Sequence, residues 1–155
     1  MTSPLVRAVI AHFDSIFTGP NGDYPPLLES LEGLTAAQAA WKPGPERNSI
    51  WQIVDHLTSS NVWGIEMFEK GSAGTPVWKE PLVSEEGWQR AVAELKSTHA
   101  RLRAAMEKYL TDESLLQYPV PEVNQTLLEL VLSTACAHQA YHVGQIGYIR
   151  GLQGL

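Results

Sequence analysis

The sequence has little of several features that define other protein classes. It contains one cysteine, Cys136, and no CxxC motif, which excludes an intrachain disulfide. Basic residues are few and form no run, and 11 Lys and Arg against 17 Asp and Glu give a net charge of −6. No nucleic-acid partner is therefore expected, because such a partner requires a cluster of Lys and Arg to neutralise its phosphates.

Long apolar runs are also missing. No stretch approaches the roughly 18 consecutive apolar residues of a membrane span. In the N-terminal segment 1–17, Arg7, His12 and Asp14 interrupt the apolar positions, so the uninterrupted apolar region of a signal peptide is absent. Together with the single cysteine, these absences predict a soluble, cytoplasmic protein with no membrane partner.

The chain of 155 residues is long enough to bury a core and suits one domain over residues 1–155. No segment shows the period-2 alternation of a strand, and no internal repeat is visible. Instead, proline and glycine divide the chain into four amphipathic helical segments. They predict an all-α fold, a four-helix bundle.

The first expected helix has a helical period through Leu5, Val9 and Ile16, breaks at residues 18–26 and resumes through residues 27–31. The second opens at Ser49 and ends at Gly71. The third begins after residue 84 and keeps its apolar face as far as residue 106. The last opens at residue 126 and runs to about residue 150, with Gly151 as its stop.

Capping boxes support two of these helix starts and the start of one short turn at residue 35. In a capping box a hydroxyl accepts a hydrogen bond from the backbone N–H three residues later, and the side chain at that later position reaches back. The predicted pairs are Thr35 with Gln38, Ser49 with Gln52, and Thr126 with Glu129.

Two of the five histidines, His138 and His142, lie four residues apart in the otherwise apolar segment 127–149. On a helix they project from one face, with Cβ atoms about 6 Å apart. That face is the apolar one, because it also includes Val131, Ala135, Ile146 and Ile149. Buried imidazoles need a partner, which is either a metal ion or nearby hydroxyls and water. The pair is not a zincin motif, since Gln139 stands where that motif has glutamate.

A third ligand would have to come from another helix, and three histidines are candidates. His56 lies beside the apolar stripe of the second helix, in line with Ser60, Trp63 and Met67. His99 lies centrally on the apolar face of the third helix, and His12 shares a line with the apolar residues of the first. Spacing alone does not choose among the three.

The stretches 31-LEGLTAAQAAWKPGPERNSIWQIVDHL-57 and 138-HQAYHVGQI-146 resemble the DinB-like family of small bacterial metalloproteins. This family includes the YfiT-like metal-dependent hydrolases and the bacillithiol and mycothiol S-transferases. The resemblance covers nearly the whole chain and implies that His56, His138 and His142 are the metal ligands. It also implies an up-down-down-up bundle with a long crossover, and a homodimer. His12 and His99 fall outside the family pattern and are expected in the pocket or the core.

Three histidine ligands leave coordination positions open, which is typical of a catalytic metal site. The donor set suits a divalent transition metal, with zinc as the default and nickel, iron or copper(II) as alternatives. Such a metal either activates water for hydrolysis or deprotonates a thiol substrate. A non-catalytic metal-binding or ligand-binding bundle is the third alternative, and it predicts a closed, dry cavity around the ion.

The sequence favours a thiol S-transferase acting on a low-molecular-weight thiol, because no acid or base stands out. Asp55 points about 100° away from His56 on a helix, and Glu66 faces outward. No catalytic residue is assigned.

Other residues near the histidines have smaller expected roles. Gln145 and Trp63 are candidates for lining a pocket. Tyr141 and Tyr148 lie off the histidine line and are expected to pack between helices or subunits. Cys136 is also off that line, so it is expected neither to bind the metal nor to act as a nucleophile.

Overall fold

The computed structural model describes residues 3–20, 22–119 and 124–155, and every regular element in these ranges is a helix. The long helices are α1 (Pro4–Thr18), α4 (Ile50–Lys70) and α5 (Glu85–Tyr109). The last long segment is continuous and consists of α7 (Leu127–Val131), the π-helical segment η2 (Leu132–Ala137) and α8 (His138–Leu152). Short helices α2 (Leu27–Ser30), α3 (Ala36–Ala40) and α6 (Asp112–Leu115) lie in the connections. The predicted all-α fold is confirmed.

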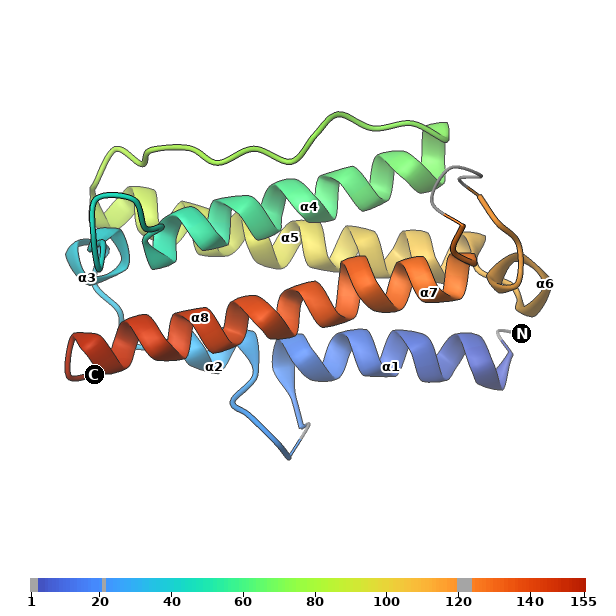
Figure 1. Ribbon diagram of the computed structural model, residues 1–155, viewed down its shortest axis with the longest axis horizontal. Helices are drawn as coiled ribbons and strands as arrows, with labels where there is room; N and C mark the ends of the chain where they lie inside the picture. The colour runs from blue at the N-terminus through green and yellow to red at the C-terminus, as the bar shows by residue number, and fades with distance from the viewer. Residues whose placement is uncertain (1–2, 21, 120–123) are drawn as a thin grey trace.

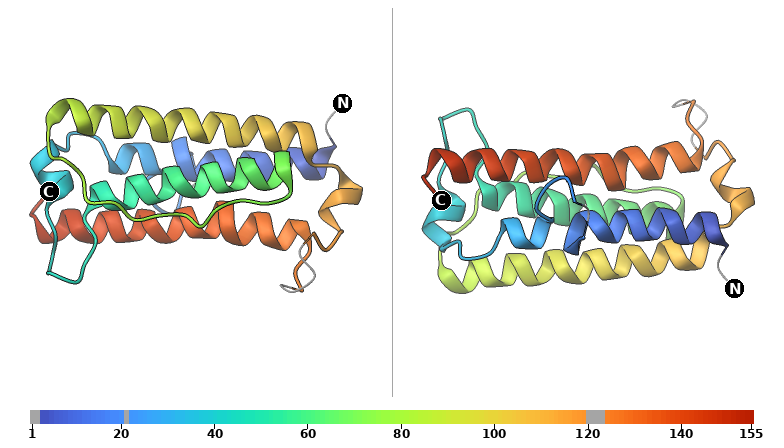
Figure 2. Two further views of the ribbon diagram at one scale, coloured as in Figure 1. Left: turned by 90° about the horizontal axis from the view of Figure 1, so that it is seen from above. Right: turned by 90° about the horizontal axis from the view of Figure 1, so that it is seen from below.

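The four long segments lie side by side along the length of the molecule (Figure 1). α1 and α7–α8 run in one direction, and α4 and α5 run in the other. Because α4 and α5 share a direction, the loop 71–84 must lead back along the whole of α4 before α5 can begin, and Figure 2 shows it on the outside of the bundle. This loop is important for the site described below.

Helix ends in the structure agree with most of the predicted signals. All three predicted capping boxes are present. At the start of α4, Ser49 Oγ accepts from the Gln52 N–H at 3.1 Å, and Gln52 Oε1 accepts from the Ser49 N–H at 3.0 Å. Gly71 ends α4 in the left-handed conformation with φ 70°, which glycine adopts without steric cost.

A continuous cluster of buried apolar side chains joins the four long segments. Phe13 of α1, Leu57 of α4, Leu95 of α5 and Ile146 of α8 are each at most 1% exposed. Burying a side chain of this size contributes roughly 1.5–3 kcal/mol, so this interior is the main source of the bundle's stability. The helix faces predicted to be apolar therefore meet in one core.

Three details differ from the sequence-based expectations. Leu5 is 42% exposed, because it lies in the first turn of α1 at the end of the bundle. Gly151 does not stop the last helix, which continues to Leu152. The stop comes three residues later, where Gly154 has φ 73° and the Leu155 N–H donates to the Arg150 carbonyl oxygen. The π-helical segment η2 had no recognised signal in the sequence.

No helix in the described ranges combines the length and the apolar character that crossing a membrane requires.

Candidate metal centre

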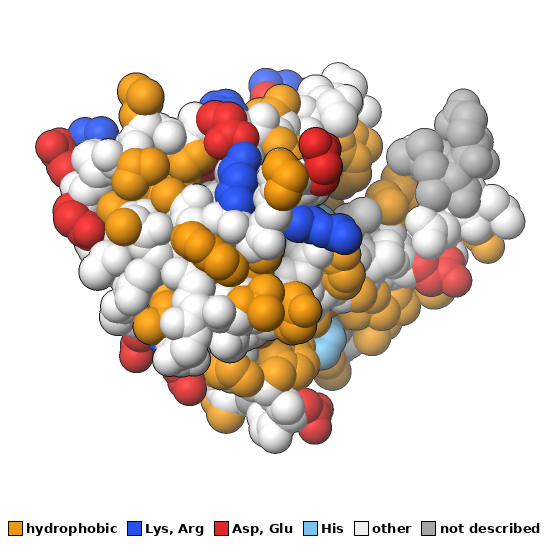
Figure 3. Space-filling model, turned by 60° about the vertical axis from the view of Figure 1, so that its left-hand side comes forward, with side chains coloured by type: hydrophobic (Ala, Val, Ile, Leu, Met, Phe, Trp, Pro, Cys, Tyr) orange, Lys and Arg blue, Asp and Glu red, His pale blue; other side chains and the backbone are white. Residues whose placement is uncertain are grey.

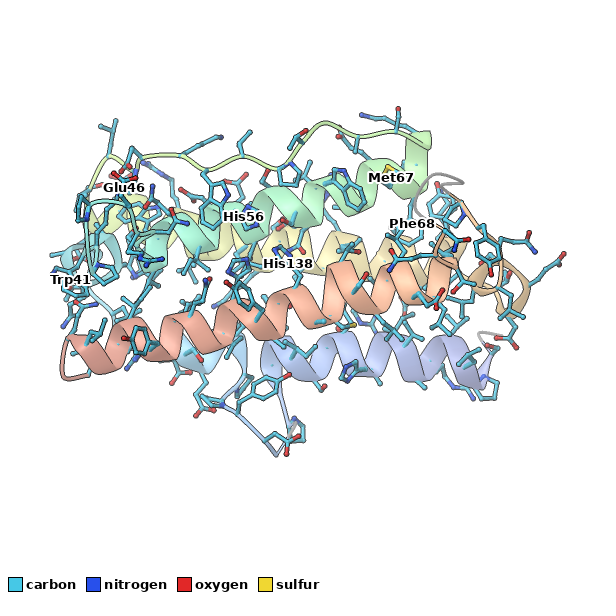
Figure 4. All side chains as sticks on the ribbon, viewed as in Figure 1. Trp41, Glu46, His56, Met67, Phe68 and His138 are labelled. Carbon is cyan, nitrogen blue, oxygen red and sulfur yellow. The ribbon has the colours of Figure 1, made fainter. Side chains whose placement is uncertain are left out.

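Three histidines from two helices converge inside the bundle. His56 comes from α4, and His138 and His142 come from α8; Figure 4 shows His56 and His138 pointing toward one another. His138 Nε2 lies 3.1 Å from His56 Nε2 and 2.9 Å from His142 Nε2. One ligand atom from each of the three residues lies within 4.8 Å of the others. The convergence expected from the sequence is therefore present.

The local structure explains the convergence. His138 and His142 are one turn apart at the beginning of α8, so their rings project from one face. That face packs against α4, where His56 immediately precedes the buried Leu57. His142 is buried with 3% of its surface exposed, and the other two histidines are half-buried.

Hydrogen bonds that link His142, Gln145 and Tyr141 determine which nitrogen of His142 bears the proton. His142 Nδ1 lies 2.7 Å from Gln145 Oε1, and Gln145 Nε2 lies 2.8 Å from the Tyr141 hydroxyl and donates to it. Because the amide oxygen can only accept, His142 Nδ1 carries the hydrogen and donates it. His142 Nε2 is then left with a lone pair directed at the other two histidines, the tautomer that a metal ligand needs.

Electrostatics keeps the three rings neutral. Burial, and then the neighbouring His138, lower the pKa of His56 to about 4, and the same two causes lower the pKa of His142 to about 4. Burial also lowers the pKa of His138. Near neutral pH the cluster thus consists of uncharged imidazoles, which is the form that binds metal ions.

The donor set fits a divalent transition metal. His138 Nε2 is close to two other ring nitrogens and, as a neutral ring, has at most one hydrogen to share with them. Lone pairs held at about 3 Å from each other repel, and a cation placed among them removes the repulsion. Imidazole nitrogens bind zinc at about 2.0–2.1 Å, a distance that side chains already gathered this closely can reach with small movements.

The crossover loop covers one side of the cluster. Trp78 stacks on His56 with the ring centroids 4.0 Å apart and the planes 5° from parallel. The Val77 N–H donates to Ser59 Oγ at 3.1 Å, which ties the loop to α4. Sequence reasoning missed Trp78, because a residue in an aperiodic loop cannot be projected onto a helix face. Its only signal was an aromatic residue within a segment otherwise rich in proline, glycine and charge.

A cavity of about 570 Å³ lies on another side, and His56 and His138 form part of its wall. Ser60, Trp63 and Met67, which share a line of α4 with His56, also form this wall. The expected pocket-lining role of Trp63 is confirmed.

The sequence model of the DinB superfamily matches residues 25–146. This range covers most of the chain and includes all three clustered histidines. The protein belongs to the DinB superfamily. Searches of curated proteins and of solved structures gave no match.

The remaining histidines of this DinB-superfamily protein lie away from the cluster. His99 is buried between the rings of Phe13 and Phe17, with centroids 4.2 and 3.7 Å away, and its expected place in the core is confirmed. His12 is exposed on α1, so its expected place in the pocket or core is wrong. It shares a line with apolar residues but lies at the edge of the buried stripe, where α1 faces solvent.

The other residues considered from the sequence have distinct places. Cys136 is buried, and burial raises the pKa of its thiol to about 11, which leaves it unreactive. Burial raises the pKa of the Asp55 carboxyl, and the charges that act on it are those of Lys79 and Glu94. Glu66 pairs with the ammonium of the lysine one turn later, at 2.9 Å.

Gln145 supports His142 through its hydrogen bond and lines a second cavity, together with Tyr141 and Tyr148, instead of the cavity beside the cluster. Tyr141 and Tyr148 are 63% and 70% exposed. Neither tyrosine is enclosed between helices of this chain.

Proposed function

We propose that His56, His138 and His142 bind one divalent transition metal ion, with zinc as the default and nickel or iron as alternatives. The observation that supports this is the convergence of three neutral imidazole Nε2 atoms from α4 and α8. The described part of the chain adds no fourth His, Cys, Asp or Glu to this group. Three protein ligands leave at least one coordination position for water or a substrate.

Two neighbouring side chains prepare the ligands. Gln145 holds His142 in the tautomer whose Nε2 faces the centre, and Tyr141 in turn orients the Gln145 amide. Trp78 lies flat on His56 and limits its ring rotation while excluding water from that side. A geometry set in advance in this way lowers the cost of organising the ligands when metal binds.

We infer further that the protein is an S-transferase for a low-molecular-weight thiol. A bound divalent ion supplies the Lewis acidity that deprotonates a thiol at neutral pH. No carboxylate is present among the described residues that line the adjoining cavity, so neither Asp55 nor Glu66 lines it, and Glu66 pairs with Lys70. The chain thus provides no evident base to assist hydrolysis, whereas thiol transfer has less need of one.

Metal analysis of the purified protein, followed by cobalt substitution and thiol titration, tests this proposal. Wild-type protein should retain about one ion per chain, as expected for a single three-ligand site. A thiol-dependent charge-transfer band in the cobalt protein, with thiol-dependent loss of an added electrophile, would support the transferase. Ester or amide cleavage without thiol would support the hydrolase instead, and a bound ion with neither activity would indicate a metal-binding bundle.

We also propose that the protein forms a homodimer through the outer face of α8. Tyr141, Tyr148 and Leu152 lie on one side of α8 and are 63%, 70% and 50% exposed. Figure 3 brings this end of the bundle forward and shows hydrophobic side chains spread over the visible face. Apolar patches of this kind are typical of protein interfaces.

Sedimentation velocity over a concentration series tests the dimer. A mass that stays at 17.1 kDa would contradict it. If the dimer is present, Tyr148→Glu should weaken it, while a change to glutamate at the exposed Gln89 of α5 should not.

A further inference from the structure

The cavity beside the histidine cluster is elongated and lies between α4, α5 and the α7–η2 segment. His56 and His138 lie at one end, and Phe68, Pro119 and Leu127 lie at the other. Figure 4 shows Met67 and Phe68 well along α4 from His56. Phe68 comes twelve positions after His56 on α4, which is a rise of roughly 18 Å at 1.5 Å per residue. The volume of about 570 Å³ is in the range that small-molecule sites occupy.

The part of the cavity wall that the structure describes has no charge. The described lining residues include no Lys, Arg, Asp or Glu, and most are apolar; among them are Leu57, Leu102, Met106, Leu130 and Val131. Moving an ionised group from water into such surroundings is costly unless a charged partner neutralises it. The wall therefore favours an uncharged occupant and disfavours a carboxylate, phosphate or ammonium group away from the metal.

Gln139 is a buried amide in this wall that lacks a partner. It follows His138 on α8, lines the cavity and is 2% exposed. Within the described part of the chain, neither its Oε1 nor its Nε2 has a hydrogen-bond partner. A buried amide left in this state is destabilising, so rotation of the Gln139 side chain into the cavity, where a ligand bonds to it, would gain affinity. A carboxamide both donates and accepts, which matches an amide or carbonyl group in a ligand.

The π-helical segment η2 forms part of the same wall. Ser133, Thr134 and Ala135 of η2 line the cavity immediately before the first clustered histidine of α8. Isolated π-helical turns are rare and occur frequently at functional sites, because they alter which side chains a helix directs toward a ligand. The irregular turn lies where the cavity wall reaches the cluster.

We propose that this cavity binds an uncharged, mainly apolar organic molecule that contains one amide or carbonyl group. Gln139 hydrogen-bonds that polar group near the histidine cluster, and the apolar part extends along α4 toward Phe68. This inference rests on the proposed function, because it describes the electrophilic co-substrate that a metal-held thiol would meet.

Titration of the full-length protein with three probes of equal alkyl length tests the proposal. N-Octylacetamide is uncharged and contains an amide, octan-1-ol is uncharged without a carbonyl, and octyl sulfate is anionic. Trp63 lines the cavity, so its fluorescence reports binding alongside calorimetry. We expect N-octylacetamide to bind roughly tenfold more tightly than octyl sulfate, with and without zinc, a factor of ten being the smallest that clearly separates the two affinities.

Two kinds of variant locate the site. Gln139→Met keeps the side-chain length and removes the amide, so it should weaken N-octylacetamide about five- to tenfold and leave octan-1-ol unchanged. Gln89→Met, on the exposed face of α5, is the matched control and should change neither affinity. Leu130→Trp and Met67→Trp fill the cavity from opposite walls and should abolish binding of both uncharged probes.

Metal stoichiometry and helical circular dichroism are measured for each variant in the same samples, so that a variant that fails to fold is recognised. If one cavity-filling variant fails to fold, probe binding by the other one tests the location of the site. Binding of octyl sulfate at least as tight as that of N-octylacetamide would overturn the proposal, as would unchanged binding in a folded cavity-filling variant. Equal loss in Gln139→Met and Gln89→Met would show that the amide has no part in recognition. If the protein binds zinc but none of the probes, this inference alone is defeated; if it binds the probes but takes up no metal at all, only the proposed function is defeated.

Discussion

His99 and the three clustered histidines lie in the same bundle and have pKa values lowered by burial, but they have different partners. Burial, the largest influence on each, lowers the pKa of His99 to about 4, the same value as for His56 and His142. His99 Nε2 lies 3.2 Å from Asp14 Oδ1 and, because a carboxylate only accepts, donates its hydrogen to that oxygen. The clustered histidines have mainly one another, at 2.9 and 3.1 Å.

The comparison shows that burial and a lowered pKa do not identify a metal ligand. What distinguishes His99 from the cluster is the partner of Nε2: a carboxylate of the same protein accepts from His99, whereas the Nε2 atoms of the clustered histidines face one another. His99 lies between two phenylalanine rings and beside a carboxylate that Arg103 also holds at 2.7 Å, which is a closed structural arrangement. The cluster brings three ring nitrogens to a common centre, where we propose that a metal ion binds.

Loss of a clustered histidine should have the largest effect. His138→Ala should lower metal affinity by roughly 100-fold or more. Loss of a residue that only hydrogen-bonds to a metal ligand already lowers metal affinity about 10- to 100-fold, and loss of a ligand should cost at least as much. His138 Nε2 is the nitrogen closest to both of the others, so its loss also opens the centre. Competition with a chromogenic chelator measures the affinity. His99→Ala is the control and should keep the ion; an ion lost with His99 but kept without His56 would mean that the third ligand has been wrongly assigned.

His99→Ala should lower the stability of the fold and leave metal affinity unchanged. Removing a ring packed between Phe13 and Phe17 should lower the free energy of unfolding by about 3 kcal/mol, as for other buried rings. Urea denaturation followed by circular dichroism measures this change. A single cooperative transition is expected for the predicted single domain over residues 1–155. A stability unchanged by the substitution would contradict the structural role assigned to His99.

The same residue should make stability depend on pH. The pKa of His99 is lowered from 6.5 to about 4 in the folded protein, so between these values the unfolded chain binds more protons. The contribution of neutral His99 is complete above pH 6.5 and is lost as the pH falls toward 4, at up to about 1.4 kcal/mol per pH unit. Denaturation of wild type and His99→Gln at several pH values measures it: the two curves should converge with acidification. Parallel curves would show that His99 does not titrate in this way.

Gln145 should have a smaller effect than any ligand. Gln145→Leu removes the acceptor that holds the His142 tautomer and should weaken metal binding roughly tenfold, as for other outer partners. Tyr141→Phe removes only the next hydrogen bond and should change affinity less than Gln145→Leu does. The chelator competition used for His138→Ala distinguishes these cases. An affinity unaffected by Gln145→Leu would mean that the hydrogen bond does not select the tautomer.

Much of the fold follows from local rules that are visible in the sequence. The capping boxes at Thr35, Ser49 and Thr126 involve residues three positions apart, so no distant contact is needed to form them. The apolar faces of α4 and α5 follow from the helical period in the same way. Details that depend on helix-end geometry, such as the stop at Gly154 in place of Gly151, were not predicted, because several C-terminal glycines meet the same local rule.

The candidate site likewise has some features that local sequence rules predict and others that they do not. The sequence by itself determined that His138 and His142 share a face, because their spacing equals one helical turn. It left three candidates for the third histidine until the family resemblance was considered, since a pattern along one helix does not specify which helix lies opposite. Tertiary structure alone brought Trp78 onto His56 and left the Gln139 amide without a partner among the described residues of the cavity wall. Each of these contacts depends on the packing of residues distant in sequence or on the exact rotation of a helix, which no local period encodes.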